Sequence, residues 1–305
     1  MSQIKAKIVA DSISPQGKRI TTFELDYPRW IHGELLTHRQ FSRNAMSSRA
    51  VPIEKMIEQV AKEPAMPVHW GKNQTGMQAK EEVSGEDKYG NDRKELLKAR
   101  WHESAKFQAS FAQEFSDHGL HKQVVNRILE PFQTMKTVLT ATEFENFFWL
   151  RNHEDAQPEI KKLAEEMLKA MEESKPIPLL PGEWHLPYYG EHGALFGSFS
   201  DQELKEAKAI SASCCAQVSY RKLDDSLEKA LKVYERLVES EPVHASPFEH
   251  QATPMTEPYN EQWHTDAPRW QEGVTHVDIV GNFWSGNFCG WIQHRQLIPN
   301  NVKKG

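Results

Sequence analysis

Polar and apolar residues alternate in two short segments near the start of the chain, at residues 5–11 and 19–26. The first reads "KAKIVAD" and the second "RITTFELD", and alternation over this length is typical of a strand with one buried face. The linker "SISPQGK" between them carries Pro15 and Gly17, which favour a tight turn. The pattern therefore predicts an antiparallel pair of strands.

Apolar residues recur at helical spacing over most of the middle of the chain. In "DDSLEKALKVYERLVES", for example, Leu227, Leu231, Tyr234 and Leu237 share one helical face. The predicted elements are a short helix after Pro28, a long loop over 64–92, helical segments over 93–130, 142–174 and 224–240, and a late strand over 273–283. These elements indicate an α+β fold, in which an antiparallel sheet is combined with a large helical portion.

Length and composition are those of a globular protein. The chain has 305 residues, of which 38% are hydrophobic, so we expect a single domain over residues 1–305. Lys and Arg number 37 against 43 Asp and Glu, a formal net charge of −6, so any site for an anion must be local. No segment has the apolar run of a signal peptide or a membrane span, which favours a cytoplasmic protein.

The cysteines and histidines do not form a recognisable metal site. Cys214, Cys215 and Cys289 are odd in number and lack C-x-x-C spacing, so we expect free thiols in the core. The segment "HASPFEHQATP" has two histidines beside Glu249, but Pro247 interrupts the helix that an H-E-x-x-H site needs. We therefore predict that no metal is bound.

Residues 37–50, "THRQFSRNAMSSRA", concentrate cations and hydroxyls in an otherwise acidic chain. They contain one histidine, three arginines, one threonine and three serines. Arginine forks match phosphate oxygens bidentately, and serine hydroxyls add short hydrogen bonds to them. The segment therefore predicts a site for a phosphorylated small molecule, with an exposed basic loop that pairs with surface carboxylates as the alternative.

The same segment resembles the signature of the flavin-dependent thymidylate synthases. That signature is Arg-His-Arg, two residues, Ser, one residue, Asn-Glu, one residue, Ser, one residue, Arg. Six of its eight fixed positions are in register: His38, Arg39, Ser42, Asn44, Ser47 and Arg49. Thr37 and Ala45 stand where the family has Arg and Glu.

Three other segments resemble this family as well. "NFFWLRNHEDAQPEI", residues 146–160, resembles its helix with Asn, then Leu-Arg, then Ala-Gln-x-Glu-Ile, although Asp155 replaces the usual His. "ASCCAQVSY" and "SPFEH" resemble the family's Ala-Arg-Val-Ser and Pro-Phe-Glu-His segments. In the family these last two stand at the N-terminus, so the chain resembles a circular permutant in which 209–300 correspond to that part. Residues 60–118 are then a helical and loop insertion.

The permuted order offers an explanation for a short internal sequence repeat. "GNFCGWIQHRQL" near the end of the chain repeats the His-Arg-Gln of "WIHGELLTHRQF" near its start. The resemblance implies that both occupy the place of the family's Arg-His-Arg helix. His294 and Arg295 are therefore candidates to share or take over flavin binding.

The resemblance also implies roles for individual residues. Arg151 is the residue that holds and polarises the uracil ring, and Ser47 is the second catalytic candidate. The flavin contacts are His38, Arg39, Asn44, Asn146, Ser219, His250, His294 and Arg295. The nucleotide contacts are Glu34, Arg43, Ser47, Ser48, Arg49, Arg127 and Arg151, with Glu34 and Arg43 as compensation for the two departures from the signature.

The implied activity is reductive methylation of dUMP to dTMP with bound FAD, methylenetetrahydrofolate as carbon donor and NADPH as reductant. No nucleophilic cysteine is needed, because an arginine and the flavin supply the chemistry. The resemblance further implies a homo-oligomer, a tetramer or a dimer, with shared active sites. Two alternatives stay open: a related hydroxymethylase or alkyltransferase of pyrimidine nucleotides, and a noncatalytic module that binds nucleotides or nucleic acid.

Overall fold

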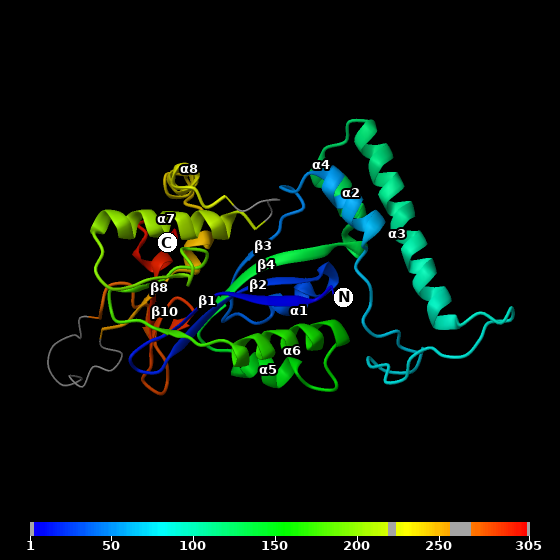
Figure 1. Ribbon diagram of the computed structural model, residues 1–305, viewed down its shortest axis with the longest axis horizontal. Helices are drawn as coiled ribbons and strands as arrows, with labels where there is room; N and C mark the ends of the chain where they lie inside the picture. The colour runs from blue at the N-terminus through cyan, green and yellow to red at the C-terminus, as the bar shows by residue number, and fades with distance from the viewer. Residues whose placement is uncertain (1–2, 219–223, 257–269, 304–305) are drawn as a thin grey trace.

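The computed structural model describes residues 3–218, 224–256 and 270–303. At its centre is a five-stranded sheet in the order β3-β4-β2-β1-β5 (Figure 1). Its strands are β1 (Lys5–Ile13), β2 (Arg19–Pro28), β3 (Ser42–Ala45), β4 (Thr134–Ala141) and β5 (Ile177–Pro178). Neighbouring strands pair antiparallel except β1 and β5, which pair parallel. The predicted hairpin of 5–11 and 19–26 is confirmed by β1 and β2.

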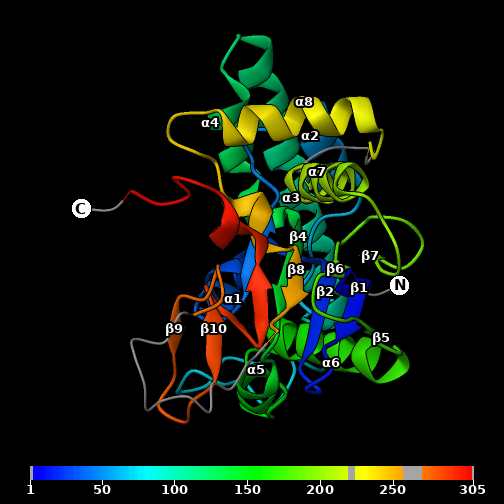
Figure 2. The ribbon, with the colours of Figure 1, turned by 90° about the vertical axis from the view of Figure 1, so that its left-hand side faces the viewer.

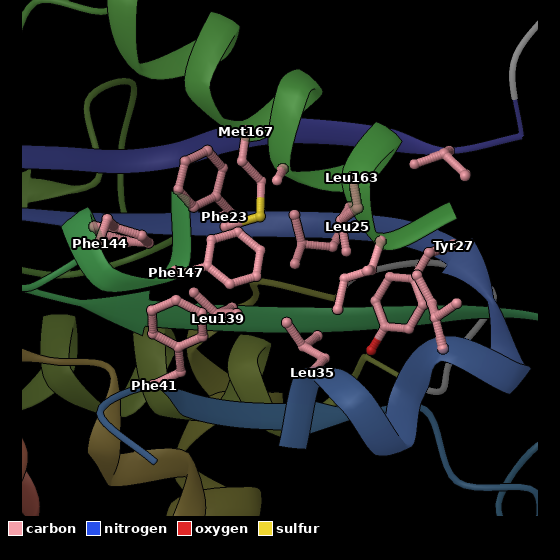
Figure 3. Close-up of a cluster of buried hydrophobic side chains, with 14 of the residues drawn as sticks. Phe23, Leu25, Tyr27, Leu35, Phe41, Leu139, Phe144, Phe147, Leu163 and Met167 are labelled. Carbon is pink, nitrogen blue, oxygen red and sulfur yellow. The ribbon is translucent and has the colours of Figure 1, made fainter. Parts of the chain in front are cut away.

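One face of this sheet is apolar because alternate residues of β2 and β4 point to the same side. Phe23 and Leu25 of β2 and Leu139 of β4 are fully buried there. They pack against α5 (Glu145–Arg151) and α6 (Pro158–Glu173), which contribute Phe147 and Met167 to the same cluster (Figure 3). This cluster fixes α5, and with it Arg151, against the sheet.

The opposite face of the sheet is lined by hydroxyls, including the buried Thr22 and Thr140. It is covered by α7 (Asp201–Ala216), by the 3₁₀ turn η3 (Ser246–Glu249) and by a small sheet in the order β12-β8-β6-β7. The strands of this sheet are β6 (Trp184–His185), β7 (Ala194–Leu195), β8 (Ala252–Pro254) and β12 (Trp291–Gln293). The turned view shows α7 and α8 (Leu227–Val238) on one side of the central strands, with α5 and α6 on the other (Figure 2).

The remaining helices lie at the two ends of the motif at 37–50. Before it come the turn η1 (Arg29–Ile31) and α1 (His32–Leu36), and after it α2 (Ile53–Lys62). The long α3 (Arg93–Asp117), α4 (Lys122–Ile128) and the turn η2 (Glu130–Phe132) follow, and α2 to α4 share a second apolar cluster. The predicted loop at 64–92 and the predicted helical middle of the chain are confirmed. Among the described residues, no helix is both long and apolar enough to cross a membrane.

The structure differs from the predicted elements at two places. Residues 42–45, where no strand is predicted, form the edge strand β3, because they pair with β4 in register from Ser42 to Ala45. Residues 273–283, expected as one strand, form a hairpin of β9 (His276–Val277) and β10 (Phe283–Ser285), which β11 (Phe288–Cys289) extends. The side chain of Asp278 accepts hydrogen bonds from the backbone N–H groups of Val280 and Asn282 and so folds the turn.

Candidate functional site

The side chain of Arg151 joins α5 to the region around α1. Its Nε donates to Nε2 of His38 at 3.0 Å, and its Nη1 donates to Oε2 of Glu34 at 2.9 Å. Nη2 lies 3.4 Å from Oγ1 of Thr37. A guanidinium has five N–H donors, so two are not used by these three contacts and can reach a ligand. We call Glu34, Thr37, His38 and Arg151 the arginine cluster.

His38 is a neutral imidazole in this cluster. Burial and the nearby guanidinium groups of Arg151 and Arg43 lower its pKa to about 4. Because Nε2 accepts a hydrogen bond from Arg151, the single proton of the ring is on Nδ1. The ring also packs against Phe41 and Phe147, which belong to the cluster in Figure 3. His38 therefore orients Arg151 as an acceptor and brings no positive charge to it at neutral pH.

Arg43 connects the arginine cluster to a pocket. Its Nη1 donates to the carbonyl oxygens of Leu35 at 2.9 Å and His38 at 3.0 Å, so it satisfies carbonyls at the end of α1. The pocket has a volume of about 330 Å³, at the lower end of the range of about 300–1,000 Å³ typical of small-molecule sites. Its lining residues are Arg43, Asn44, Ala45, Ser47, Ala50, Ala216, Val218 and Ser246.

These lining residues come from three distant parts of the sequence. The motif at 37–50 supplies one wall, the segment "ASCCAQVSY" at the end of α7 supplies Ala216 and Val218, and "SPFEH" supplies Ser246. A hydrogen bond of 3.3 Å from Nδ2 of Asn44 to the carbonyl of Cys215 holds two of the walls together. The pocket thus unites three of the segments on which the sequence resemblance depends.

Ser42 lies next to this pocket in sequence and is held by residues that sequence reasoning missed. Nε2 of Gln293 lies 3.3 Å from its hydroxyl, and Nδ2 of Asn287 lies 3.0 Å from it. Gln293 also donates to Oδ1 of Asn287 at 2.8 Å. Gln293 comes directly before the second His-Arg pair. The repeat of His-Arg-Gln near both ends of the chain is therefore the sequence feature that could have indicated this segment.

The thymidylate synthase complementing protein family has a model that matches residues 13–177, more than half of the chain. The chain belongs to this family. A comparison with curated proteins gave no match. Among solved structures, a UMP/dUMP methylase, PolB from Streptomyces cacaoi bound with 5-Br dUMP, has a TM-score of 0.42 and 17% identity over 56% of this chain and 90% of that chain. The same protein bound with 5-Br UMP has a TM-score of 0.44 and 17% identity over 56% and 89%.

The family match covers the arginine cluster and the motif side of the pocket but ends before the second His-Arg pair. His294 is buried among the rings of Trp184, Tyr234 and Phe248, and burial lowers its pKa to about 3. Arg295 forms an ion pair with Glu249. Both residues belong to the turn η4 (His294–Leu297), and neither lines the pocket beside Ser47.

His250 is the last residue of a buried hydrogen-bond chain on the hydroxyl-lined face of the sheet. Its Nδ1 lies 2.8 Å from Oγ1 of Thr140, which lies 2.7 Å from Oγ1 of Thr22. Thr22 lies 2.8 Å from Nε2 of His185, whose Nδ1 lies 2.9 Å from the hydroxyl of Ser12. All five side chains are fully buried. This chain of hydrogen bonds crosses the sheet from Ser12 on β1, through Thr22 on β2 and Thr140 on β4, to His250.

The positions of the protons in this chain are linked to one another. Burial lowers the pKa of His185 and of His250 to about 3, so each ring is neutral and carries one proton. If Ser12 donates to His185, every later group donates in turn, and His250 keeps its proton on Nε2. The reverse order leaves the buried Ser12 hydroxyl without an acceptor among the described residues, which is unfavourable. The chain therefore favours His250 with an N–H at Nε2, an atom with no partner in the described part of the molecule.

The other predicted site residues of this family member are mostly exposed. Arg39, Arg49, Arg127 and Asn146 are exposed, and Nε of Arg127 donates to the carbonyl of Gln123 in its own helix. The carbonyl of Ser48 accepts a hydrogen bond of 2.7 Å from Nδ2 of Asn126, and the backbone N–H of Arg49 lies 3.3 Å from the hydroxyl of Ser47. Ser219 lies outside the described residues.

The cysteines are placed as predicted. Cys214, Cys215 and Cys289 are buried free thiols, and burial raises the pKa of Cys214 to about 12. Thiols in such surroundings are poor nucleophiles. Within the described ranges, no group of three or more His, Cys, Asp or Glu residues has the arrangement of a metal site.

Proposed function

We propose that the protein is a flavin-dependent thymidylate synthase that converts dUMP to dTMP. In the overall reaction, methylenetetrahydrofolate gives one carbon, and NADPH with a proton gives two electrons and two hydrogens, leaving tetrahydrofolate and NADP⁺. The observation that carries the proposal is the pocket in which Arg43 to Ser47 meet Ala216, Val218 and Ser246. These segments resemble one family's site in sequence, and they meet in space although they are far apart in the chain.

The nucleotide phosphate is assigned to Ser47 and Arg49, supported by Ser48. Ser47 lines the pocket, and Arg49, whose side chain is exposed, is two residues away. Charge-assisted hydrogen bonds of this type bind phosphate strongly. Arg43 contributes positive charge from the same wall of the pocket. Arg127 stays a candidate contact, from the end of α4.

Arg151 is assigned to the pyrimidine ring. Methylation at C5 of uracil builds negative charge on the ring carbonyls, and a fixed cation lowers the energy of that state. Glu34 and His38 fix the guanidinium by hydrogen bonds to Nη1 and Nε, which leaves the outer N–H groups for a carbonyl oxygen. Glu34 is thus a positioning residue for Arg151.

The residues around the pocket fit a flavin in part. Asn44 lines the pocket with an amide, Arg39 and Asn146 offer an exposed cation and an exposed amide, His38 offers a neutral imidazole, and the buried Nε2 of His250 has no partner among the described residues. A bound flavin supplies the redox step, and these residues bind and orient it. A pocket of about 330 Å³ is small for a whole dinucleotide, which supports a homo-oligomer, a tetramer or a dimer, in which a second copy completes the cofactor site.

The order of the segments supports a circular permutation. We assign residues 209–300 to the part that other family members carry at the N-terminus. The contacts of α7 and η3 with the wall formed by β3 support this correspondence, because they bring "SPFEH" to the motif at 37–50.

A second candidate is a related flavin- and folate-dependent hydroxymethylase or alkyltransferase of pyrimidine nucleotides. It is favoured by Ala45, which lines the pocket at the position where the signature has Glu. Without that carboxylate, this position in the wall of the pocket lacks a side-chain hydrogen-bond acceptor for the substrate. A noncatalytic nucleotide-binding or nucleic-acid-binding module is the third candidate, and it predicts neither flavin binding nor turnover.

One experiment separates the three candidates. The purified protein is titrated with FAD, the excess is removed, and the oxidised-flavin absorbance is measured. The holoenzyme is then incubated with dUMP, NADPH and methylenetetrahydrofolate, and the nucleotide is analysed by mass spectrometry. A methyl product supports the synthase, a hydroxymethyl product supports the second candidate, and a colourless, inactive protein contradicts both.

A further inference from the structure

Lys208 on α7 places its amino group over an aromatic ring and not beside a carboxylate. Its Nζ lies 3.5 Å from the centroid of the ring of Trp184 on β6. Trp184 is buried, and Lys208 is half-buried. Half-buried lysines elsewhere in the protein pair with acids, as Lys136 does with Glu24 at 2.8 Å. Among the described residues no carboxylate forms an ion pair with Lys208, so the indole face holds its charge.

The surroundings of this amino group are apolar. Trp184 belongs to a buried cluster with Leu186 and Ala207. Burial lowers the pKa of Lys208 to about 8, below the ordinary value of 10.5. At neutral pH about one Lys208 side chain in ten is therefore a neutral amine. The neutral amine is a nucleophile, whereas the ammonium ion is not.

A buried polar atom without a partner lies in the same surroundings. The ring of His294 contacts that of Trp184, with the two centroids 5.7 Å apart. Burial and, to a smaller extent, the positive charge of Lys208 lower the pKa of His294 to about 3, because the two groups lie near each other. Nδ1 of His294 is buried and has no hydrogen-bond partner in the described part of the chain. An unpaired buried polar atom is unfavourable, and a small bound molecule with a polar group would satisfy it.

The contact with Trp184 selects the class of molecule that Lys208 binds covalently. The neutral amine attacks the carbonyl carbon of an aldehyde, and loss of one water leaves a C=N bond, without any oxidant or reductant. The proton that leaves the ammonium ion before the attack returns to the imine nitrogen. The product is again a cation and keeps its interaction with the indole face. An acyl group would leave a neutral amide and lose this interaction.

We propose that Lys208 is a covalent binding site for small, uncharged aldehydes, which it holds as a protonated imine over Trp184. The aldehyde is uncharged because the apolar surroundings disfavour a second, unpaired charge. A hydroxyl or similar group on the aldehyde can pair with Nδ1 of His294. Lys208 does not belong to the lining of the pocket beside Ser47, so this site is independent of whether that pocket binds a flavin.

Reductive trapping of the imine tests the site. The full chain is incubated at pH 7 with acetaldehyde and sodium cyanoborohydride, which converts an imine to a stable ethylamine, and its peptides are analysed by mass spectrometry. The internal reference is Lys205, an exposed lysine three residues earlier in α7. Ethylation should be about tenfold faster at Lys208, because burial favours its neutral amine by more than the lower basicity weakens the nucleophile.

Three variants test the role of the aromatic ring. Lys208→Arg keeps the charge over Trp184 but cannot form an imine, so the fast-reacting site should be lost. Trp184→Leu keeps apolar packing without the ring. The acetaldehyde concentration that gives half-maximal trapping at Lys208 should then rise about 2- to 30-fold, the value of one cation–π interaction. Trp184→Phe retains an aromatic face and should stay close to the wild type.

Two results would overturn the proposal. Ethylation of Lys208 no faster than that of Lys205 would mean that Lys208 only covers apolar surface with its side chain, as many lysines do. This comparison is made within the wild-type protein, so it does not depend on the folding of a variant. Equal half-maximal concentrations for Trp184→Leu and Trp184→Phe would mean that the indole does not hold the imine.

Discussion

Arg151 donates a hydrogen bond of 3.0 Å from Nε to Nε2 of His38, although the two residues are 113 positions apart in the chain. The contact joins α5 to the second residue after α1, and it requires a neutral histidine with its proton on Nδ1. The histidine therefore orients the guanidinium through an acceptor that carries no charge.

The first prediction concerns the planar fork of Arg151. Arg151→Lys keeps the positive charge, but a single ammonium group cannot reach His38, Glu34 and a ligand carbonyl together. We expect normal FAD binding and a fall in the rate of turnover of about 10²–10³, the usual cost of losing one donor that acts in the transition state. Single-turnover oxidation of reduced flavin with dUMP and methylenetetrahydrofolate present measures this rate.

Arg29→Lys is a matched control for that variant. Arg29 pairs with Glu130 at side-chain exposures of 23% and 35%, and Arg151 pairs with Glu34 at 22% and 37%. Both substitutions remove the fork from a half-buried ion pair, so both should lower stability by a similar small amount. Turnover should fall only in Arg151→Lys. Equal rates in the two variants would make Arg151 a structural residue.

Much of the fold follows from local pattern. The strands β1 and β2 alternate between a buried and a polar face, and their hairpin was predicted on that ground. Strand β4 was not predicted because it is buried on both faces over Thr137 to Ala141, which removes the alternation. Strand β3 was not predicted because "SRNA" has low strand propensity and owes its conformation to pairing with β4.

The site was only partly accessible to sequence reasoning. Arg43, Asn44 and Ser47 stood out by residue type, and they do line a pocket. The partners of Ser42 lie 245 and 251 positions away, and no local pattern indicates a contact at that separation. The resemblance to the flavin-dependent thymidylate synthases implied that "SPFEH" lies close to the motif at 37–50. The physical cause of this contact is the packing of η3 against the hydroxyl-lined face of the sheet.

The second prediction concerns the nucleotide phosphate. Arg49→Ala should weaken dUMP binding by about tenfold or more, since a charge-assisted hydrogen bond is worth about 1.5–3 kcal/mol. FAD binding should be retained. Isothermal titration with dUMP measures the affinity, and Arg236→Ala, an exposed arginine on α8, is the control. An unchanged affinity in Arg49→Ala would place the phosphate elsewhere, with Arg127 as the next residue to test.

The third prediction concerns acid stability. Burial lowers the pKa of His185, His250 and His294 to about 3, below the ordinary value of 6.5. Between these values the unfolded chain binds protons that the native protein does not, so the free energy of unfolding falls as the pH falls from about 6.5 towards 3. Each histidine contributes a slope of about 1.4 kcal/mol per pH unit in that window.

Urea titrations between pH 7 and pH 5 measure this slope, in a range above the titration of most carboxyl groups. His294→Phe should reduce the slope by about one proton, because phenylalanine retains the contacts with Trp184 and Phe248 but cannot be protonated. A slope equal to that of the wild type would mean that His294 is already protonated in the native protein at pH 5.

The last prediction concerns the buried chain from Ser12 to His250. Thr140→Val removes the hydroxyl that contacts Nδ1 of His250 and Oγ1 of Thr22, and it changes the shape of the side chain very little. The proton of His250 is then no longer directed to Nε2 by its neighbours. If Nε2 donates to the flavin, the affinity for FAD should fall about 2- to 10-fold, the value of one neutral hydrogen bond.

Thr137→Val is the matched control for this variant. Thr137 is on the same strand, is equally buried, and has a hydroxyl 2.6 Å from that of Tyr27 on the apolar side of the sheet. Each variant leaves buried polar atoms without a partner, so both should lose about 1–3 kcal/mol of stability. FAD affinity should fall in Thr140→Val alone, and the NMR signals of the His250 ring should report a change of tautomer there. If both variants bind FAD equally well and the tautomer is unchanged, the chain only stabilises the fold, and the positioning of His250 must come from another contact.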